Sequence, residues 1–398
     1  MPDPSATDQL DRRGFISAAI GASAAFSAVV MPASAETTAT PVAPPLGGTV
    51  YTGDVIAGKK VITALDVEDL EPGQKHLLYF QGVQTPAGQH SYVSTMVAKG
   101  AQPGPRVALI SGVHGDEISS IRTVQRVMEQ LDPAAMSGTV LAVFDVSRPA
   151  LINMQRRWPN SGRGIGLIDI NREWPGNANG GTASSRHAAL VFSQLLAPNA
   201  DYAIDFHTAA TGMDMTDLLL APMDQPEVRA MAELFPVRQI FDFAGYPGLL
   251  ALALADVGIP TFTPEVGAPR IVDQEMIADF VEGTLNVLKH YGILAGPIGR
   301  TSTDTAAFVG DGQHVVAASE GGFVEVLVRL DEEVSPGQAV ATQRNAFGEV
   351  VADYATDTGG RVAAFRTDAT AEPGDPLVFI LFDSTAPQVQ DVAEVVPE

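Results

Sequence analysis

Residues 107–131, VALISGVHGDEISSIRTVQRVMEQL, decide the fold of this chain. The run Val107–Ile110 is short and wholly apolar, as in a strand that is buried on both faces. From Ile118 to Leu131 the apolar residues recur at helical spacing, which predicts an amphipathic helix. A strand that leads through a glycine-rich turn into a helix is the repeating unit of an α/β domain.

The same alternation of apolar runs and amphipathic stretches continues on both sides of this segment, over about residues 51–296. It predicts a mixed, largely parallel sheet flanked by helices. Beyond the opening unit, we expect strands at 140–146, 202–206, 218–220 and 261–263, and helices at 183–196, 249–257 and 272–291.

After residue 296 the helical spacing disappears. Six short segments rich in Val and separated by Gly predict a small all-β domain, a barrel or sandwich, over residues 297–398. Its turns at Pro336-Gly337 and Pro373-Gly374 resemble those of biotinyl/lipoyl-type barrel-sandwich domains. No lysine follows Lys289, so this domain has no acceptor for biotin or lipoate. We therefore expect it to cover the catalytic domain or to serve in assembly.

The first 35 residues have the features of an export signal. Arg12-Arg13 precede a weakly apolar run, and Ala33-Ser34-Ala35 resembles a cleavage site. Paired arginines are typical of twin-arginine signals, so we expect a periplasmic or extracellular protein, with residues 36–50 as a linker. A membrane anchor is the alternative. The run is short and rich in Ala, Ser and Gly, whereas a membrane span needs ~20 predominantly apolar residues.

Composition excludes several classes of partner and site. The chain has 398 residues, with 24 Lys and Arg against 47 Asp and Glu, no Cys, and a net charge of −23. Nucleic acid and anionic membranes would repel such a protein, although a salt-rich habitat would also explain the acidity. Without Cys there are no disulfides, Fe–S clusters or thiol nucleophiles. A metal must therefore be bound by His, Asp and Glu.

Three residues form a candidate metal site. His114 and Glu117, three positions apart, are expected on one face of the first helical turn. His207 follows the predicted strand at 202–206, at the strand end where ligands bind in open α/β sheets. Two His and one Glu suit catalytic zinc, with the fourth position left for water. Asp205 is placed to orient an imidazole. Taken singly, these motifs are also typical of an acidic helix start and a solvated loop histidine.

A second group of residues suits an anionic substrate. Asn171 and Arg172 offer an amide and a guanidinium side by side, and Arg binds carboxylates in a bidentate manner. Together with Arg156, Arg157 and Arg163 they make residues 156–172 a basic island in an acidic chain, where we expect the substrate to bind. The alternative is a turn rich in Asn, Pro and Gly.

Glu265 lies just after the predicted strand at 261–263. A carboxylate beside a metal-bound water can act as general base, although taken alone this residue is more typical of an ordinary strand-end turn.

In this order the motifs H-x-x-E, D-x-N-R-x-x-P-G, D-x-H-T and P-E-x-G look like the zinc carboxypeptidase clan. More narrowly, residues 51–296 resemble the succinylglutamate desuccinylase/aspartoacylase family, in which a C-terminal β-domain is also common. The resemblance implies one zinc ion per chain, bound by His114, Glu117 and His207. It also implies that Glu265 is the general base and acid.

The same resemblance assigns the substrate residues. It implies that Asn171 and Arg172 bind the substrate carboxylate, and that Arg163 helps to polarise the scissile carbonyl. The chain departs from the family at Ser147-Arg148-Pro149, where relatives tend to have Asn-Pro. His187 is not a family ligand, and we expect it on the surface or in packing.

Three functions remain open at this level. The leading hypothesis is zinc-dependent hydrolysis of the amide bond in a small anionic N-acyl amino acid. The alternatives are an exported metallocarboxypeptidase for short or cell-wall peptides, and a zinc- or ligand-binding protein that keeps the fold without the reaction. The sequence does not choose the acyl group, the amino acid or the oligomeric state.

Overall fold

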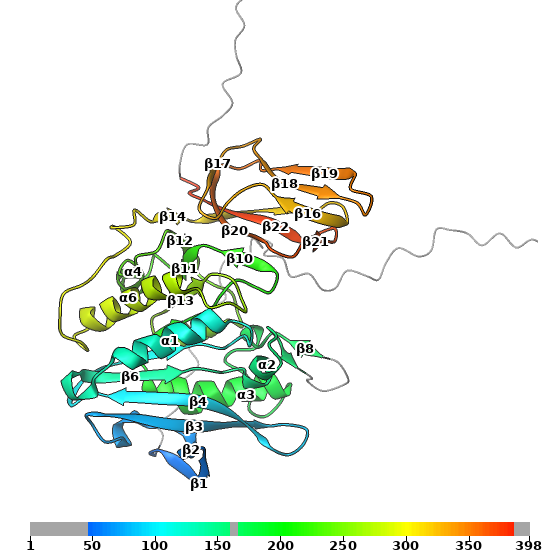
Figure 1. Ribbon diagram of the computed structural model, residues 1–398. Coiled ribbons are helices and arrows are strands. Elements are labelled where there is room, and N and C mark those ends of the chain that lie inside the picture. Colours follow the sequence, from blue (N-terminus) through cyan, green and yellow to red (C-terminus); the bar gives the residue numbers. More distant parts are fainter. Residues whose placement is uncertain (1–46, 160–165, 386–398) are drawn as a thin grey trace, which may run out of the picture. The chain divides into compact units, whose positions relative to one another are not determined.

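An eleven-stranded mixed sheet is the main element of the fold (Figure 1). The computed structural model describes residues 47–159 and 166–385. The strands at the centre of the sheet are parallel, as predicted for an α/β domain. In order across the sheet they are β1 (Val50–Ile56), β2 (Lys59–Ala64), β3 (Gln74–Gln84), β4 (His90–Lys99), β6 (Ser137–Val143), β5 (Gln102–Ile110), β9 (Tyr202–Asp205), β13 (Thr261–Val266), β11 (Asp217–Ala221), β12 (Gln239–Asp242) and β14 (Phe308–Gly310).

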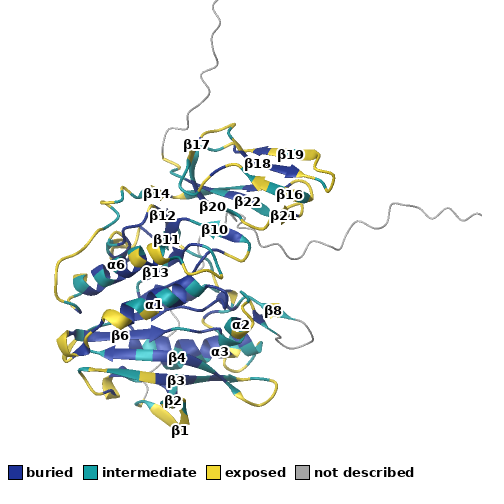
Figure 2. Ribbon diagram, in the orientation of Figure 1, coloured by how far each residue is buried: buried dark blue, intermediate teal, exposed yellow. Residues whose placement is uncertain are grey.

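Helices cover both faces of this sheet. Neighbouring residues of its central strands point to opposite sides, so both faces carry apolar side chains that helices bury. On β5, Leu109 packs in one apolar cluster while Ala108 and Ile110 pack in the other. Figure 2 shows the central strands as buried. The first cluster is closed by α1 (Ile118–Gln130), α4 (Pro226–Ala232) and α6 (Gln274–His290), and the second by α3 (Ala183–Val191) and α5 (Leu250–Asp256).

The predicted elements around the motifs are confirmed within a few residues, except that α3 continues over 192–196 as a π-helical turn. The four strands from β1 to β4 were not predicted. Their polar content hides the alternation: β4 buries every second side chain from Ser91 to Val97, but Ser91 and Thr95 stand among the buried ones. Two short elements near the site complete the α/β part, α2 (Arg148–Ile152) and the hairpin of β7 (Trp158–Pro159) with β8 (Leu167–Ile168).

The C-terminal region consists of two antiparallel sheets, as predicted for a barrel or sandwich. Val340, Val362 and Ile380 are fully buried in the core that the two sheets share. One sheet contains β10 (Met213–Met215), β20 (Gly360–Arg366), β22 (Pro376–Phe382) and β15 (Gly312–Ala317), with β17 (Glu333–Val334) on β20. The other contains β19 (Val350–Ala355), β18 (Ala339–Arg344), β16 (Gly322–Val326) and β21 (Thr370–Ala371).

Each of the two regions lends a strand to the other. Strand β14 follows residue 296 but extends the large sheet beside β12. Strand β10 precedes residue 296 but pairs with β20 of the C-terminal region. Gln239 also donates hydrogen bonds to Asp331 at 3.0 Å and to the Val362 carbonyl at 3.2 Å. Strands β10 and β14 each pair with a strand on the other side of residue 296. The domain boundary at residues 296/297 stays a prediction.

The predicted export signal at residues 1–35 and most of the linker at 36–50 lie outside the described residues. None of the helices in the described part of the chain combines the length and the apolar character that a membrane crossing requires.

Candidate metal centre and active site

The loop between β5 and α1 carries the first two candidate ligands. Gly112 has a φ of +67°, and a Cβ there would lie 2.6 Å from the Phe144 carbonyl oxygen. Gly115 has no room for a side chain either, because a Cβ would lie 2.2 Å from the backbone of Ala150 in α2. The two glycines therefore let the loop pack against its neighbours and hold its shape.

His114 and Glu117 both lie in this loop, and the prediction that they occupy the first turn of the helix is wrong. Glu117 is the residue before α1, with a φ of −89° and a ψ of 68° that are not helical. The loop, not helical spacing, brings the two side chains together, and both are almost completely buried.

His207 joins them from the far end of β9. His114 Nδ1 lies 2.7 Å from Glu117 Oε1, and His207 Nδ1 lies 2.9 Å from Glu117 Oε2. The two Nδ1 atoms are 3.2 Å apart. One ligand atom from each residue thus falls within 4.8 Å of the others, so the predicted trio could hold a metal ion.

The opposite ring nitrogen of each imidazole faces a carboxylate. His114 Nε2 lies 3.0 Å from Asp169 Oδ1, and His207 Nε2 lies 3.2 Å from Asp205 Oδ2. Such a carboxylate fixes the ring and makes the other nitrogen a better ligand. The position of Asp205 agrees with the expectation from the sequence. The contact of Asp169 was missed, although its motif had been singled out.

The charges of the site favour a bound cation. Burial would raise the pKa of Glu117, but His114 and His207 outweigh it and hold that pKa well below its usual range. Burial would also raise the pKa of Asp169, but the contact with His114 outweighs it and holds that pKa below its usual range. Burial lowers the pKa of His207, yet Asp205 and Glu117 raise it well above the usual value. The carboxylates are thus held in the charged form, and a bound metal would take the place of the proton that the raised pKa keeps on His207.

The donor atoms fit a metal better than a set of hydrogen bonds. Glu117 Oε2 is buried and has no hydrogen bond, although His207 Nδ1 is close to it. Neutral imidazoles that keep their proton on Nε2, beside Asp169 and Asp205, turn their Nδ1 lone pairs toward Glu117, which as a carboxylate has no proton to share. A zinc ion, which takes imidazole nitrogen and carboxylate oxygen, would satisfy all three groups.

Glu265 lies beside this trio on β13. It forms a β-bridge with His207, and it is only 9% exposed. Burial raises its pKa to about 8; His207 counters this rise and Glu117 adds to it. Its Oε2 atom is buried without a hydrogen bond. The carboxylate is therefore close to the metal ligands and has an acceptor atom that the fold does not use.

Asn171 and Arg172 lie in a short turn (Ile170–Arg172) that Asp169 caps by accepting from the Asn171 N–H at 2.9 Å. The Arg172 guanidinium lies 3.7 Å from Asp169 and packs over the ring of Tyr246, 4.9 Å from its centroid. Since Asp169 also contacts His114, one carboxylate links the predicted carboxylate-binding pair to the metal trio. Tyr246 was not predicted, because its loop carries no motif.

The arginine beside the metal trio is Arg156. Its Nη1 atom lies 2.7 Å from Glu117 Oε1, and its Nη2 atom lies 4.0 Å from Asp169. Arg163, the residue predicted for this place, lies outside the described residues. The sequence identified the basic segment that contains both arginines but not the contact of Arg156 with Glu117, and the role of Arg163 stays a prediction.

The two departures from the family pattern have structural places. Arg148 begins α2, the helix against which Gly115 packs. His187 is fully buried and packs 4.9 Å from the Trp158 ring, with Nε2 2.9 Å from the Val146 carbonyl oxygen. It belongs to packing, as one of the two expectations had it, and is not a ligand.

Comparison with known proteins agrees with this site. The succinylglutamate desuccinylase/aspartoacylase catalytic domain matches residues 103–291, which include both histidines, Glu117 and Glu265. N-alpha-acetyl-L-2,4-diaminobutyric acid deacetylase from Halomonas elongata is 26% identical over 297 residues, which are 72% of this chain and 84% of that protein.

Solved structures extend the likeness to about four fifths of the chain. A succinylglutamate desuccinylase/aspartoacylase from Rhodobacter sphaeroides has a TM-score of 0.70 at 25% identity and covers 80% of this chain and 99% of its own. The product-bound ectoine utilization protein from Ruegeria pomeroyi shares the fold, with a TM-score of 0.70 at 20% identity over 79% of this chain and 97% of its own. The related proteins that are named as enzymes are deacylases, which hydrolyse an amide bond as amidohydrolases do. Residues 103–291 of this chain therefore carry the catalytic domain of the succinylglutamate desuccinylase/aspartoacylase family.

Proposed function

We propose that this protein hydrolyses the amide bond of a small N-acyl amino acid with the help of one zinc ion. The observation that carries the proposal is the convergence of His114, Glu117 and His207 on one point, with the unbonded oxygen of Glu265 beside them. A relative that removes an acetyl group from an amino acid supports the substrate class.

The three ligands would hold zinc, which when bound supplies a Lewis acid for the scissile carbonyl and for the attacking water. Glu265 takes the proton of that water and later returns it to the departing nitrogen, the usual double task of a carboxylate in amide hydrolysis. Its bridge to His207 keeps it at a fixed distance from the ligands.

The remaining residues bind and orient. Arg156, close to Glu117, donates to the oxyanion that develops on the carbonyl oxygen. Arg172, braced by Asp169 and Tyr246, and Asn171 hold the substrate carboxylate, so that the amide carbon is presented to the water. This assignment puts the predicted polarising role on Arg156 in place of Arg163.

The test uses the Glu265→Gln variant, which keeps the size of the side chain and removes its basicity. With N-acetyl and N-succinyl amino acids as substrates we expect a loss of kcat of at least ~100-fold, while metal analysis still finds about one zinc per chain. Glu275→Gln on the exposed start of α6 is the matched control and should behave as wild type.

Three outcomes contradict the proposal. Turnover by Glu265→Gln at the wild-type rate would exclude this residue as the base. Preference for dipeptides over N-acyl amino acids would favour the carboxypeptidase alternative, and a wild-type protein that holds zinc but cleaves neither class would favour a binding protein.

A further inference from the structure

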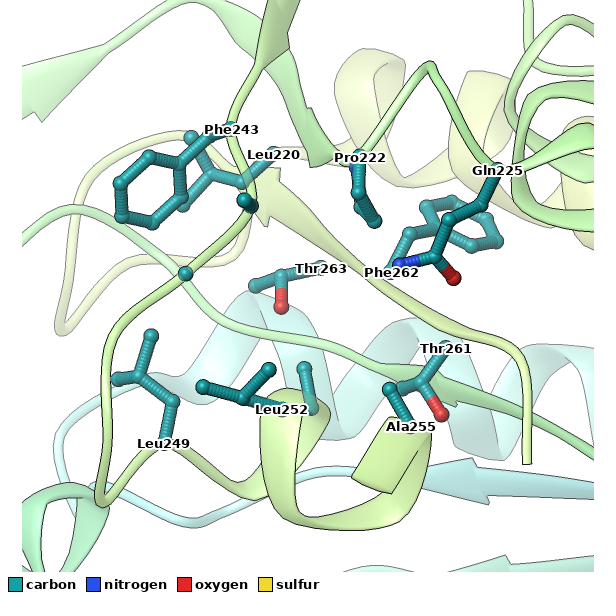
Figure 3. A pocket seen from close by; sticks show the side chains of 13 residues that line it. Leu220, Pro222, Gln225, Phe243, Leu249, Leu252, Ala255, Thr261, Phe262 and Thr263 are labelled. Carbon is teal, nitrogen blue, oxygen red and sulfur yellow. The ribbon is translucent and has the colours of Figure 1, made fainter. Parts of the chain in front are cut away.

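A small apolar pocket lies between β13, α5 and the loop at 243–249 that carries Tyr246 (Figure 3). Its volume is about 40 Å³. Figure 3 shows Leu220, Phe243, Leu249, Leu252 and Thr263 around it. None of the described residues that line it is ionisable; Gln225 and the two threonines of β13 are the polar groups. The pocket is thus neutral in an otherwise strongly charged region.

Strand β13 connects this pocket to the proposed base. Thr263 and Glu265 are two positions apart, so their side chains point to the same face of the sheet. Their partners on β11, Leu220 and Leu218, confirm the register. Two residues of strand span roughly 7 Å, and the pocket therefore begins one side-chain step from the carboxylate of Glu265.

The wall opposite β13 connects the pocket to the proposed carboxylate site. Leu249 precedes α5 and Leu250 begins it, and the Leu250 N–H donates to Asn171 Oδ1 at 2.9 Å. Gly248 has a φ of +98°, and a Cβ there would lie 2.5 Å from the Arg172 carbonyl oxygen. The loop that forms the pocket wall is thus pressed against Asn171 and Arg172, and Tyr246 of the same loop lies under the Arg172 guanidinium.

We infer that this pocket takes the side chain of the substrate's amino acid, and that it selects a small branched aliphatic side chain. The inference rests on the proposed function. A substrate whose carboxylate is on Arg172 and whose amide carbon is near Glu265 has its α-carbon between these two points, and the pocket is bounded by the segments that carry both.

Volume and polarity set the preference. A space of this size accommodates roughly three carbon atoms, which matches the atoms beyond Cβ in leucine. Aspartate has the same shape with two oxygens in place of two methyl groups. An ionised carboxylate would lose its hydration in a pocket without a charged partner, so the two side chains should be discriminated strongly.

The test compares N-acetylleucine, N-acetylaspartate and N-acetylglycine by kcat/KM. We expect wild type to favour leucine over both others by at least tenfold. Ala255→Leu adds bulk to the pocket wall and should lower the leucine-to-glycine ratio at least tenfold. Leu252→Ala enlarges the pocket and should raise the ratio of N-acetylphenylalanine to N-acetylleucine. Partial unfolding lowers kcat/KM for all substrates alike, so it cannot change either ratio. Ala278→Leu, on the exposed side of α6, is the control and should leave both ratios unchanged.

The results separate this inference from the function on which it rests. Three results would overturn the pocket assignment while leaving deacylation intact. They are ratios that do not respond to either pocket variant, equal use of N-acetylleucine and N-acetylaspartate, and a response that follows the length of the acyl group. Failure of wild type to cleave any N-acyl amino acid would overturn the proposed function. The pocket is then judged by calorimetry with free leucine: weaker binding to Ala255→Leu supports it, and equal affinity for the two proteins rejects it.

Discussion

Asn171 Oδ1 accepts a hydrogen bond of 2.9 Å from the backbone N–H of Leu250, 79 positions further along the chain. The acceptor half of this buried amide is thus occupied by the first residue of α5, where a helix has N–H groups without internal partners. The donor half remains for other contacts. One side chain therefore joins the turn at Ile170–Arg172 to the helix that lines the apolar pocket.

Two substitutions separate the structural and the binding parts of Asn171. Asn171→Ala leaves the Leu250 N–H without its acceptor and should lower the free energy of unfolding by about 1–3 kcal/mol, as measured by urea denaturation, and also raise KM. Asn171→Asp keeps the acceptor at a helix N-terminus, where a negative charge is favourable, but removes the donor. It should keep most of the stability and still raise KM at least tenfold. Equal KM values for Asn171→Asp and wild type would refute the substrate contact.

Asp169 is expected to act on the metal through His114. Asp169→Asn keeps the acceptor for the Asn171 N–H but removes the negative charge next to His114 Nε2. Losing such a carboxylate weakens metal binding by 10–100-fold in comparable sites. Zinc affinity, measured by competition with a chelator, should fall by ~10–100-fold. Asp201→Asn, which breaks an ion pair with Arg106 on the surface, is the control. Unchanged zinc affinity of Asp169→Asn would show that the contact has no effect on the metal.

Arg156 is expected to be the arginine that stabilises the oxyanion. Arg156→Lys preserves the charge but not the fork of donors, and kcat should drop by ~100-fold with zinc content unchanged. Its exposed neighbour offers a matched control, Arg157→Lys, with activity near wild type. A large loss in Arg163→Lys together with a small one in Arg156→Lys would return the role to Arg163.

His187 should make the fold sensitive to acid. Burial lowers its pKa to about 4, and the Val146 carbonyl only partly offsets this. An unfolded chain has the ordinary His pKa of about 6.5. Between these values the unfolded chain binds a proton that the folded chain does not. The free energy of unfolding therefore falls as the pH drops from about 6.5 toward 4, by up to ~1.4 kcal/mol per pH unit, and is independent of this group above that range.

Urea denaturation at a series of pH values checks this effect. His187→Gln should have a shallower slope below pH ~6.5 than wild type, whatever its stability at neutral pH, whereas His290→Gln on the exposed end of α6 should retain the wild-type slope. An identical slope for His187→Gln would mean that other groups cause the acid sensitivity.

The metal trio could be proposed from the sequence because each of its members follows a strand with a clear apolar pattern. Val107–Ile110 and residues 202–206 are such strands, and parallel neighbours end at the same edge of a sheet. The candidate ligands that follow these strands therefore had to lie close together, even though the helical conformation predicted for His114 and Glu117 was wrong. That error arose because a helical period says nothing about where the turn before the helix ends.

Contacts made by loops could not be predicted in the same way. Asp169, Arg156 and Tyr246 reach the site from segments without periodicity, and their positions depend on tertiary packing, such as that of Gly248 on the Arg172 backbone. The strands β1 to β4 escaped prediction for a related reason: polar side chains on their buried positions weaken the alternation that marks a strand.

The exchange of β10 and β14 determines how the protein can be shortened. A chain cut after residue 296 would lose β14, and the outer side of β12 would become a bare sheet edge. It would also lose β20, and the unpaired β10 begins only six residues after His207. Bare edges invite pairing between molecules, so the isolated α/β part would tend to aggregate and would loosen next to His207, a proposed metal ligand. A stable protein for experiments on the α/β part therefore has to include the C-terminal sheets.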